Sequence, residues 1–184
     1  MRADAKKNRD HLLEVAGTAI AEQGADVSLR DIARKAEVGL TTLLRHFPTR
    51  EALLDALLRT SFDELAAKAG ELEMSNSPED ALLTWLRDCV ACATEFRGVT
   101  TLMAAAIEDT ESALHDSCVT MRAAGARLLV RAQDAGMARS DLDGTDLFAL
   151  VAALAWLGDQ ASLAPRANHL FDVVSSAILV KAGS

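Results

Sequence analysis

Hydrophobic residues recur at helical spacing along almost the whole chain, and polar, glycine or proline breaks separate the runs. The pattern predicts an all-α protein of about nine helices without strands. The predicted helices span roughly residues 6–23, 29–36, 40–47, 50–73, 78–97, 99–108, 112–136, 144–159 and 165–181. We expect a three-helix head at residues 1–49 and a larger helical bundle at residues 50–184.

The segment over residues 28–54 predicts two short helices joined by a tight turn, followed by a long helix. Ser28 is placed to cap the first short helix. Gly39 is expected to supply the backbone freedom that the turn needs. The second helix spans residues 40–47, and Pro48 ends it because a residue before proline avoids the helical region.

One side of this second helix is apolar and the other is polar. The apolar side carries Leu40, Leu43, Leu44 and Phe47, and the polar side carries Thr41, Thr42, Arg45 and His46. Hydroxyls can bond base edges, and Arg45 can reach a phosphate or a guanine. The layout is that of a helix-turn-helix, whose second helix enters the major groove of DNA. An ordinary solvated helix face looks the same, so the pattern alone leaves both interpretations open.

The string VGLTTLLRHFPTREALL resembles the signature of TetR-family transcriptional repressors. The matching residues are Val38, Thr42, Leu43, His46, Phe47 and Arg50. The resemblance covers residues 28–54 and extends to the preceding helix, and the remaining helices fit loosely. It implies base-reading roles for Arg30, Leu40, Thr41 and Thr42. It also implies phosphate contacts from Ser28, His46 and Arg50.

Two positions in the second helix depart from that family pattern. Leu44 stands where the family usually has a tyrosine, which removes one hydroxyl contact to phosphate. Leu40 is exposed in the family, whereas the helical wheel here would bury it. We expect Leu40 to be at least partly in the core; if exposed, it can pack on a thymine methyl group.

Charge is distributed unevenly along the chain, whose formal net charge is −8. Residues 1–50 carry nine Lys and Arg against seven Asp and Glu, whereas residues 51–184 carry ten against twenty. A footprint for DNA is therefore confined to the N-terminal quarter, and the acidic remainder should face away from phosphate. Residues 2–9 form a basic arm, which either contacts phosphate or is solvated.

Targeting and membrane signals are not apparent in the sequence. The N-terminus lacks the apolar segment of a signal peptide, and the apolar run over residues 147–157 is 11 residues long. That run is too short to span a bilayer. We expect a cytoplasmic protein without membrane contact.

Three cysteines are the main candidates for other chemistry. Cys89 and Cys92 form a C-x-x-C pair and Cys118 stands alone, so a metal site is not expected. Small apolar packing is the first interpretation, and a thiol sensor is the second. The four scattered histidines and the lack of a phosphate-binding loop argue against an enzyme or a cofactor. A helical adaptor that binds protein is a further alternative.

The last two long helices are apolar over most of their circumference, so each must be covered on two sides. Either a second subunit provides the second cover or these are central helices of a monomer. The resemblance implies a homodimer through these helices. Two heads related by a twofold axis would read a palindromic operator in double-stranded DNA.

The resemblance also implies a small-molecule effector bound among the middle helices, whose binding releases the repressor from DNA. The candidate effector-binding residues are Phe62, Trp85, Cys89, Met103, Met121 and Trp156. His115, Asp88 and Glu108 are candidate polar groups of the same pocket. The low aromatic content favours a small or aliphatic effector, and ordinary core packing is the alternative role for each residue.

Overall fold

A computed structural model describes residues 2–24, 27–96, 109–110, 112 and 115–180, and it is all-α as predicted. The helices are α1 (Arg2–Gln23), α2 (Leu29–Lys35), α3 (Leu40–His46), α4 (Arg50–Leu72), α5 (Pro78–Glu95), α7 (His115–Asp134), α8 (Gly144–Asp159) and α9 (Ala167–Ile178). A short 3-10 helix, Ala164–Arg166, precedes α9. The helix predicted over residues 99–108 lies outside the described residues.

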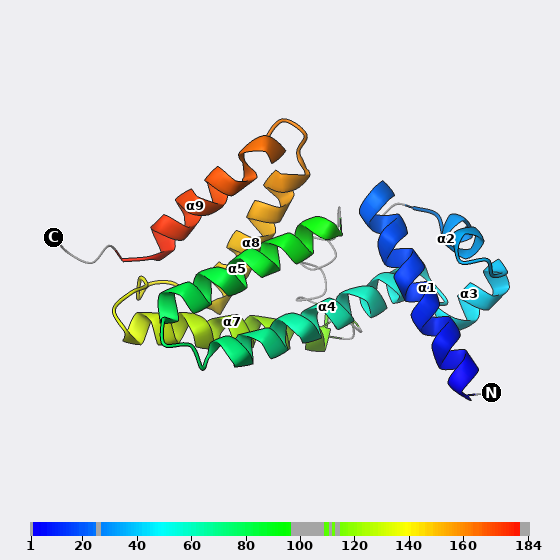
Figure 1. Cartoon of the computed structure of the whole chain (residues 1–184), viewed down its shortest axis with the longest axis horizontal. Helices are drawn as coiled ribbons and strands as arrows, with labels where there is room; N and C mark the ends of the chain where they lie inside the picture. The colour runs from blue at the N-terminus through cyan, green and yellow to red at the C-terminus, as the bar shows by residue number, and fades with distance from the viewer. Residues whose placement is uncertain (1, 25–26, 97–108, 111, 113–114, 181–184) are drawn as a thin grey trace.

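Helix α4 connects two groups of helices (Figure 1). At its N-terminal end α1, α2 and α3 pack together, and α1 also contacts α4. Along the rest of its length α4 packs on α5 and α7, and α8 packs on the same two helices. Any rotation of α4 therefore changes how the α1–α3 group is oriented relative to the other helices.

Four helices of the described residues, α2, α4, α5 and α8, begin after a residue whose side chain caps them. The side chains of Ser28, Thr49, Ser77 and Asp143 each accept a hydrogen bond from a backbone N–H in the first turn that follows. These bonds satisfy donors that a helix leaves without a partner. The starts of α2, α4, α5 and α8 are therefore confirmed.

The turn before α3 differs from its prediction. Gly39 has ordinary extended angles, φ −68° and ψ 144°, so it does not use the conformational freedom of glycine. The left-handed residue is Glu37, with φ 56°. The reversal therefore occurs directly after α2, where the Glu37 N–H donates to the Arg34 carbonyl at 3.2 Å.

The last helix is shorter than the apolar pattern predicts. Its first turn is 3-10 around Pro165, and it ends at Ile178 instead of near Lys181. The Arg139 N–H donates to the Ile178 carbonyl at 3.0 Å, and Val180 donates to Met137 at 2.9 Å. The chain after α9 thus pairs with the loop after α7. Backbone groups at the end of α9 find their hydrogen-bond partners in that loop and not in a further helical turn.

The basic arm predicted over residues 2–9 is also helical, because α1 begins at Arg2. Alanine and lysine, which are frequent in this segment, are good helix formers. Cations in residues 6–9 are therefore held on a helix.

Candidate nucleic-acid interface

The side chains of α3 range from fully buried to exposed around the helix. Leu43 is fully buried and Phe47, just after the helix, is buried with it. Thr41 and Arg45 are exposed on the opposite side, while Thr42 and His46 are half-buried at its edges. Packing in the α1–α3 core thus fixes the helix and directs a hydroxyl and a guanidinium outward.

The two unusual leucines of α3 behave differently from one another. Leu40 is half-buried and packs against the core, which confirms that it is at least partly a core residue. Leu44 belongs to the apolar side of the helical wheel, yet its exposed fraction is 37 %. The outer surface of α3 therefore carries an apolar edge beside its polar centre.

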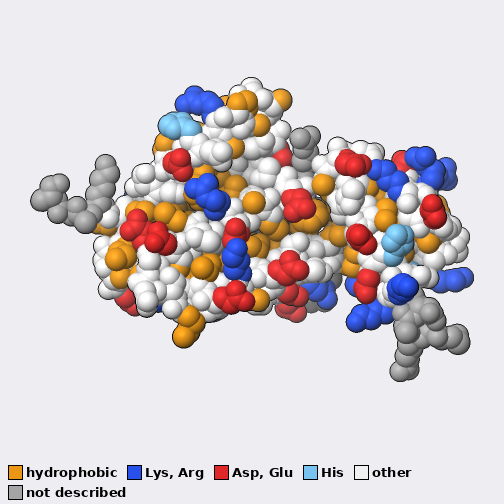
Figure 2. Space-filling view, viewed as in Figure 1, with side chains coloured by type: hydrophobic (Ala, Val, Ile, Leu, Met, Phe, Trp, Pro, Cys, Tyr) orange, Lys and Arg blue, Asp and Glu red, His pale blue; other side chains and the backbone are white. Residues whose placement is uncertain are grey.

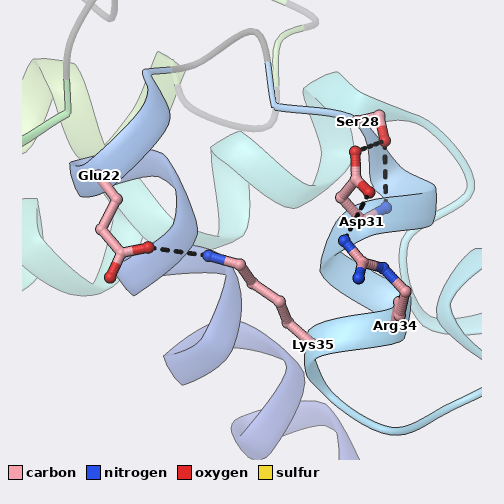
Figure 3. Close-up of polar contacts among 5 residues, drawn as sticks. All are labelled: Glu22, Ser28, Asp31, Arg34 and Lys35. Atoms are coloured by element: carbon pink, nitrogen blue, oxygen red, sulfur yellow. Dashed lines mark hydrogen bonds and ion pairs between the residues drawn. The ribbon is translucent and has the colours of Figure 1, made fainter.

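Ser28 is occupied by the cap of α2. Its hydroxyl accepts from the Asp31 N–H at 3.1 Å and donates to Asp31 Oδ2 at 2.6 Å (Figure 3). The Ser28 hydrogen bond, followed by one from Arg34, lowers the pKa of the Asp31 carboxyl. The predicted phosphate contact of Ser28 would have to share this hydroxyl with the cap, whereas Arg30 on the same helix is exposed.

Two further cations of α2 are engaged in ion pairs, which Figure 3 also shows. Arg34 contacts Asp31 at 3.2 Å, and Lys35 contacts Glu22 of α1 at 2.8 Å. Exposed pairs of this kind contribute little free energy. The Lys35 pair nevertheless links α2 to the end of α1.

Arg50 has a contact that sequence reasoning missed. Its Nη2 donates to the Val27 carbonyl at 2.7 Å, so the first residue of α4 holds the segment before α2. The donor and acceptor are 23 residues apart and no local pattern signals the bond. Arg50 therefore supports the geometry of the head, whatever part it takes in DNA contact.

Arg9 of α1 lies over the ring of Phe47, with its guanidinium carbon 5.3 Å from the ring centroid. This cation–π contact places a cation of α1 at the C-terminal end of α3. Figure 2 shows Lys and Arg side chains gathered, among some acidic ones, at the end of the molecule formed by α1–α3, whereas acidic side chains predominate over the rest of that face. The uneven charge of the sequence is thus also uneven in space.

Four of the six predicted effector residues lie together in the structure. Phe62, Trp85, Cys89 and Met121 all belong to the buried core between α4, α5 and α7. Trp156 is 54 % exposed on α8, and Met103 lies outside the described residues, as does Glu108. Trp85 also donates its indole N–H to the Leu65 carbonyl of α4 at 3.0 Å.

A pocket of about 220 Å³ lies between α4 and α5. It is lined by Ser61, Glu64, Leu65, Lys68, Asp88, Cys92 and Glu95. Lys68 forms an ion pair with Asp88 across it. Asp88 is the effector candidate from sequence that lines this pocket, and His115 stands at the start of α7.

Burial governs the chemistry of the cysteines. It raises the pKa of Cys92 and of Cys118 to about 11, and it raises the pKa of Cys89 further. Thiols in this range stay protonated at neutral pH, and the thiolate is the reactive form. The structure favours the packing interpretation over the thiol-sensor interpretation.

Among the described residues, none of the helices is long and apolar enough to cross a membrane.

The fold and this surface define a helix-turn-helix protein of the class that binds DNA. Residues 12–57 match the bacterial regulatory proteins of the tetR family, and residues 77–178 match the C-terminal domain of SbtR-like transcriptional regulators. The chain belongs to the TetR family of transcriptional regulators, and it is a regulator instead of an enzyme.

Solved structures extend the match over the whole fold. A TetR transcriptional regulator from Streptomyces coelicolor is 33% identical, with a TM-score of 0.68 over 95% of this chain and 99% of that chain. A TetR transcription regulatory protein from Mycobacterium vanbaalenii is 31% identical, with a TM-score of 0.64 over 97% of this chain and 99% of that chain.

Similarity to curated relatives is more local. The transcriptional repressor KstR2 of Rhodococcus jostii is 36% identical over 76 residues, which are 41% of this chain and 37% of that protein. The chain spans little more than a third of the length of the curated relatives it matches.

Proposed function

We propose that the protein is a cytoplasmic repressor that binds a palindromic DNA operator as a homodimer and leaves it when a small molecule binds. The observation that carries the DNA-binding part is α3, where Thr41 and Arg45 point outward above the buried Leu43. A short rigid helix with small hydroxyls and a guanidinium on its outer side fits the major groove. Repression is the activity named for the similar KstR2.

Residues 1–49 act as the DNA-binding domain in this proposal, and residues 50–184 act as the domain for dimerisation and effector binding. Arg30, Leu40, Thr41 and Thr42 read bases, with Arg45 reaching a guanine or a phosphate. Ser28, His46 and Arg50 position the head on the backbone. Backbone contacts fix the register, and base contacts carry the sequence preference.

The dimer forms through α8 and α9. Trp156 of α8 and Val173 of α9 are 54 % and 52 % exposed, although both helices are rich in apolar residues. A second copy would cover this surface and remove it from water. The twofold axis would then set the two α3 helices about 34–36 Å apart, one helical turn of DNA.

The effector acts through α4. The pocket between α4 and α5 is lined from α4 by Ser61, Glu64, Leu65 and Lys68. A small ligand wedged there would favour one position of α4 over another, and the α1–α3 group would follow. The ligand shifts this balance only by the difference between its affinities for the two states.

A salt titration tests the DNA-binding part. Affinity of the full-length protein for a random duplex should fall by about 10³ or more between 50 and 200 mM salt, because each phosphate contact releases counterions. An adaptor that binds protein would have negligible affinity for the duplex at any salt concentration, and that result would remove the proposal.

Two variants then separate positioning residues from reading residues. Arg50→Ala should weaken binding to all duplexes alike, whereas Thr42→Ala should change the preferred sequence. Arg50 also holds the Val27 carbonyl, so the stability of both variants is measured by thermal unfolding alongside binding. Identical effects of the two variants on sequence preference would refute this division of roles.

A further inference from the structure

Leu44 is an exposed hydrophobic side chain on the helix that the proposed function places in the major groove. Its exposed fraction is 37 %, and the other large hydrophobic residues exposed to this degree among the described residues all lie after α4 begins. Leu44 therefore stands out in a head whose other large apolar side chains, where the structure describes them, are buried or half-buried.

The position of Leu44 on α3 explains what it can touch. Thr41 and Leu40 precede it by three and four residues, so both are its neighbours along the helix surface. Thr41 is exposed and Leu40 is half-buried against the core. Leu44 thus extends an apolar edge from the core to the outer surface, beside the polar strip formed by Thr41 and Arg45. The half-buried Thr42 lies at the other edge of that strip.

The major groove has one prominent apolar group, the 5-methyl group of thymine. Leucine has no donor for a phosphate and no partner for the polar atoms of guanine, adenine or cytosine. A leucine side chain packed on the thymine methyl group would remove apolar surface of both groups from water. We infer that Leu44 packs against a thymine methyl group and sets a preference for thymine beside the base that Thr41 or Arg45 contacts. This inference rests on the proposed function.

Replacing thymine by deoxyuridine provides the test, because it removes the methyl group and keeps every hydrogen-bonding atom of the base. An operator is first enriched from a random-sequence library with the full-length protein. Each thymine of one half-site is then replaced in turn, and affinities are measured for the wild type, Leu44→Ala and Met74→Ala. Met74 is an exposed apolar residue just after the C-terminal end of α4, and Figure 1 shows that end of α4 far from the head, so its variant is the matched control.

The wild type and Met74→Ala should lose about fourfold in affinity at one thymine of the half-site, the factor expected for one buried methyl group. Leu44→Ala should still bind the operator, and its affinity should not change when that thymine is replaced by deoxyuridine. A uracil profile of Leu44→Ala that matches the wild type at every position would overturn the inference and leave the proposed function standing. Failure of the wild type to bind any duplex would overturn both.

Discussion

Glu37, in the turn between α2 and α3, has a left-handed backbone, φ 56°, that glycine adopts without strain. Its side chain is exposed. Glu37→Gly should therefore stabilise the protein by roughly 0.5–1 kcal/mol, the range expected when left-handed strain is relieved against the added chain entropy of glycine. Urea unfolding measures the change.

Gly39→Ala is the matched control for that substitution. A Cβ at Gly39 would lie 4.0 Å from its nearest neighbour, Thr42 Oγ1, and the backbone angles there suit any residue. Its unfolding free energy should stay within about 0.5 kcal/mol of the wild type. If Gly39→Ala greatly lowered the unfolding free energy and Glu37→Gly did not raise it, the chain would have to change direction at Gly39 and not at Glu37.

The thiols of Cys92 and Cys118 give the second prediction at the residue scale. Cys92 and Cys118 have pKa values raised to about 11 by burial, so the folded state keeps these thiols protonated where the unfolded chain would ionise them. Their contribution to stability is complete below the ordinary thiol value near 9 and is lost as pH rises from there towards 11.

Unfolding free energies measured between pH 7.5 and 10.5 should accordingly fall more steeply for the wild type than for a Cys92→Ala, Cys118→Ala double variant. Iodoacetamide should label the native thiols slowly at pH 8 and the urea-unfolded thiols rapidly, because only the thiolate reacts. Equal labelling rates in the two states would show that these cysteines are accessible in the fold.

At the scale of elements, Trp85 joins three helices. Its indole bonds the Leu65 carbonyl of α4 and lies against Gly125 of α7. A Cβ at Gly125 would come within 2.5 Å of Trp85 Cζ3, and Trp85 is buried and tethered. Gly125→Ala should therefore destabilise the protein by about 1–3 kcal/mol through overpacking, despite alanine's higher helix propensity.

The matched substitution is Gly70→Ala in α4, where a new Cβ would meet nothing within 4 Å. It should stabilise the protein by roughly 0.5–1 kcal/mol, since alanine is the better helix former. Chemical denaturation of both variants gives the comparison. The two substitutions should change the unfolding free energy in opposite directions. Changes in the same direction would contradict the inference that the Trp85 ring is held in place against Gly125.

At the scale of the molecule, the proposed dimer would form through the exposed apolar surface of α8 and α9. A Trp156→Glu, Val173→Glu double variant should be monomeric, because carboxylates buried in an apolar interface are costly. Light scattering after gel filtration measures the state. The same variant should lose affinity for a two-half-site operator.

Val130→Glu provides the control, because Val130 on α7 is as exposed as Val173, each at 52 %. It should remain dimeric and keep its affinity for DNA. A dimer that survives the double variant and dissociates in Val130→Glu would place the interface on α7 instead of on α8 and α9.

Sequence alone determined the helices that begin with caps and the helix-turn-helix layout, because these signals are local. Ser28 and Asp143 cap backbone groups within three residues, and the burial of Leu43 follows from helical spacing. The family signature in residues 38–50 is equally local. The head could therefore be located before any tertiary contact was known.

Only the tertiary structure decided which side chains are exposed and which bind a distant part of the chain. Arg50 meets the Val27 carbonyl, Trp156 faces outward, and α9 ends where its chain pairs with Ala138. Each outcome depends on a neighbour distant in sequence, and helical periodicity carries no information about such neighbours. Left-handed strain at Glu37 likewise depends on how α2 and α3 must meet, which composition does not encode.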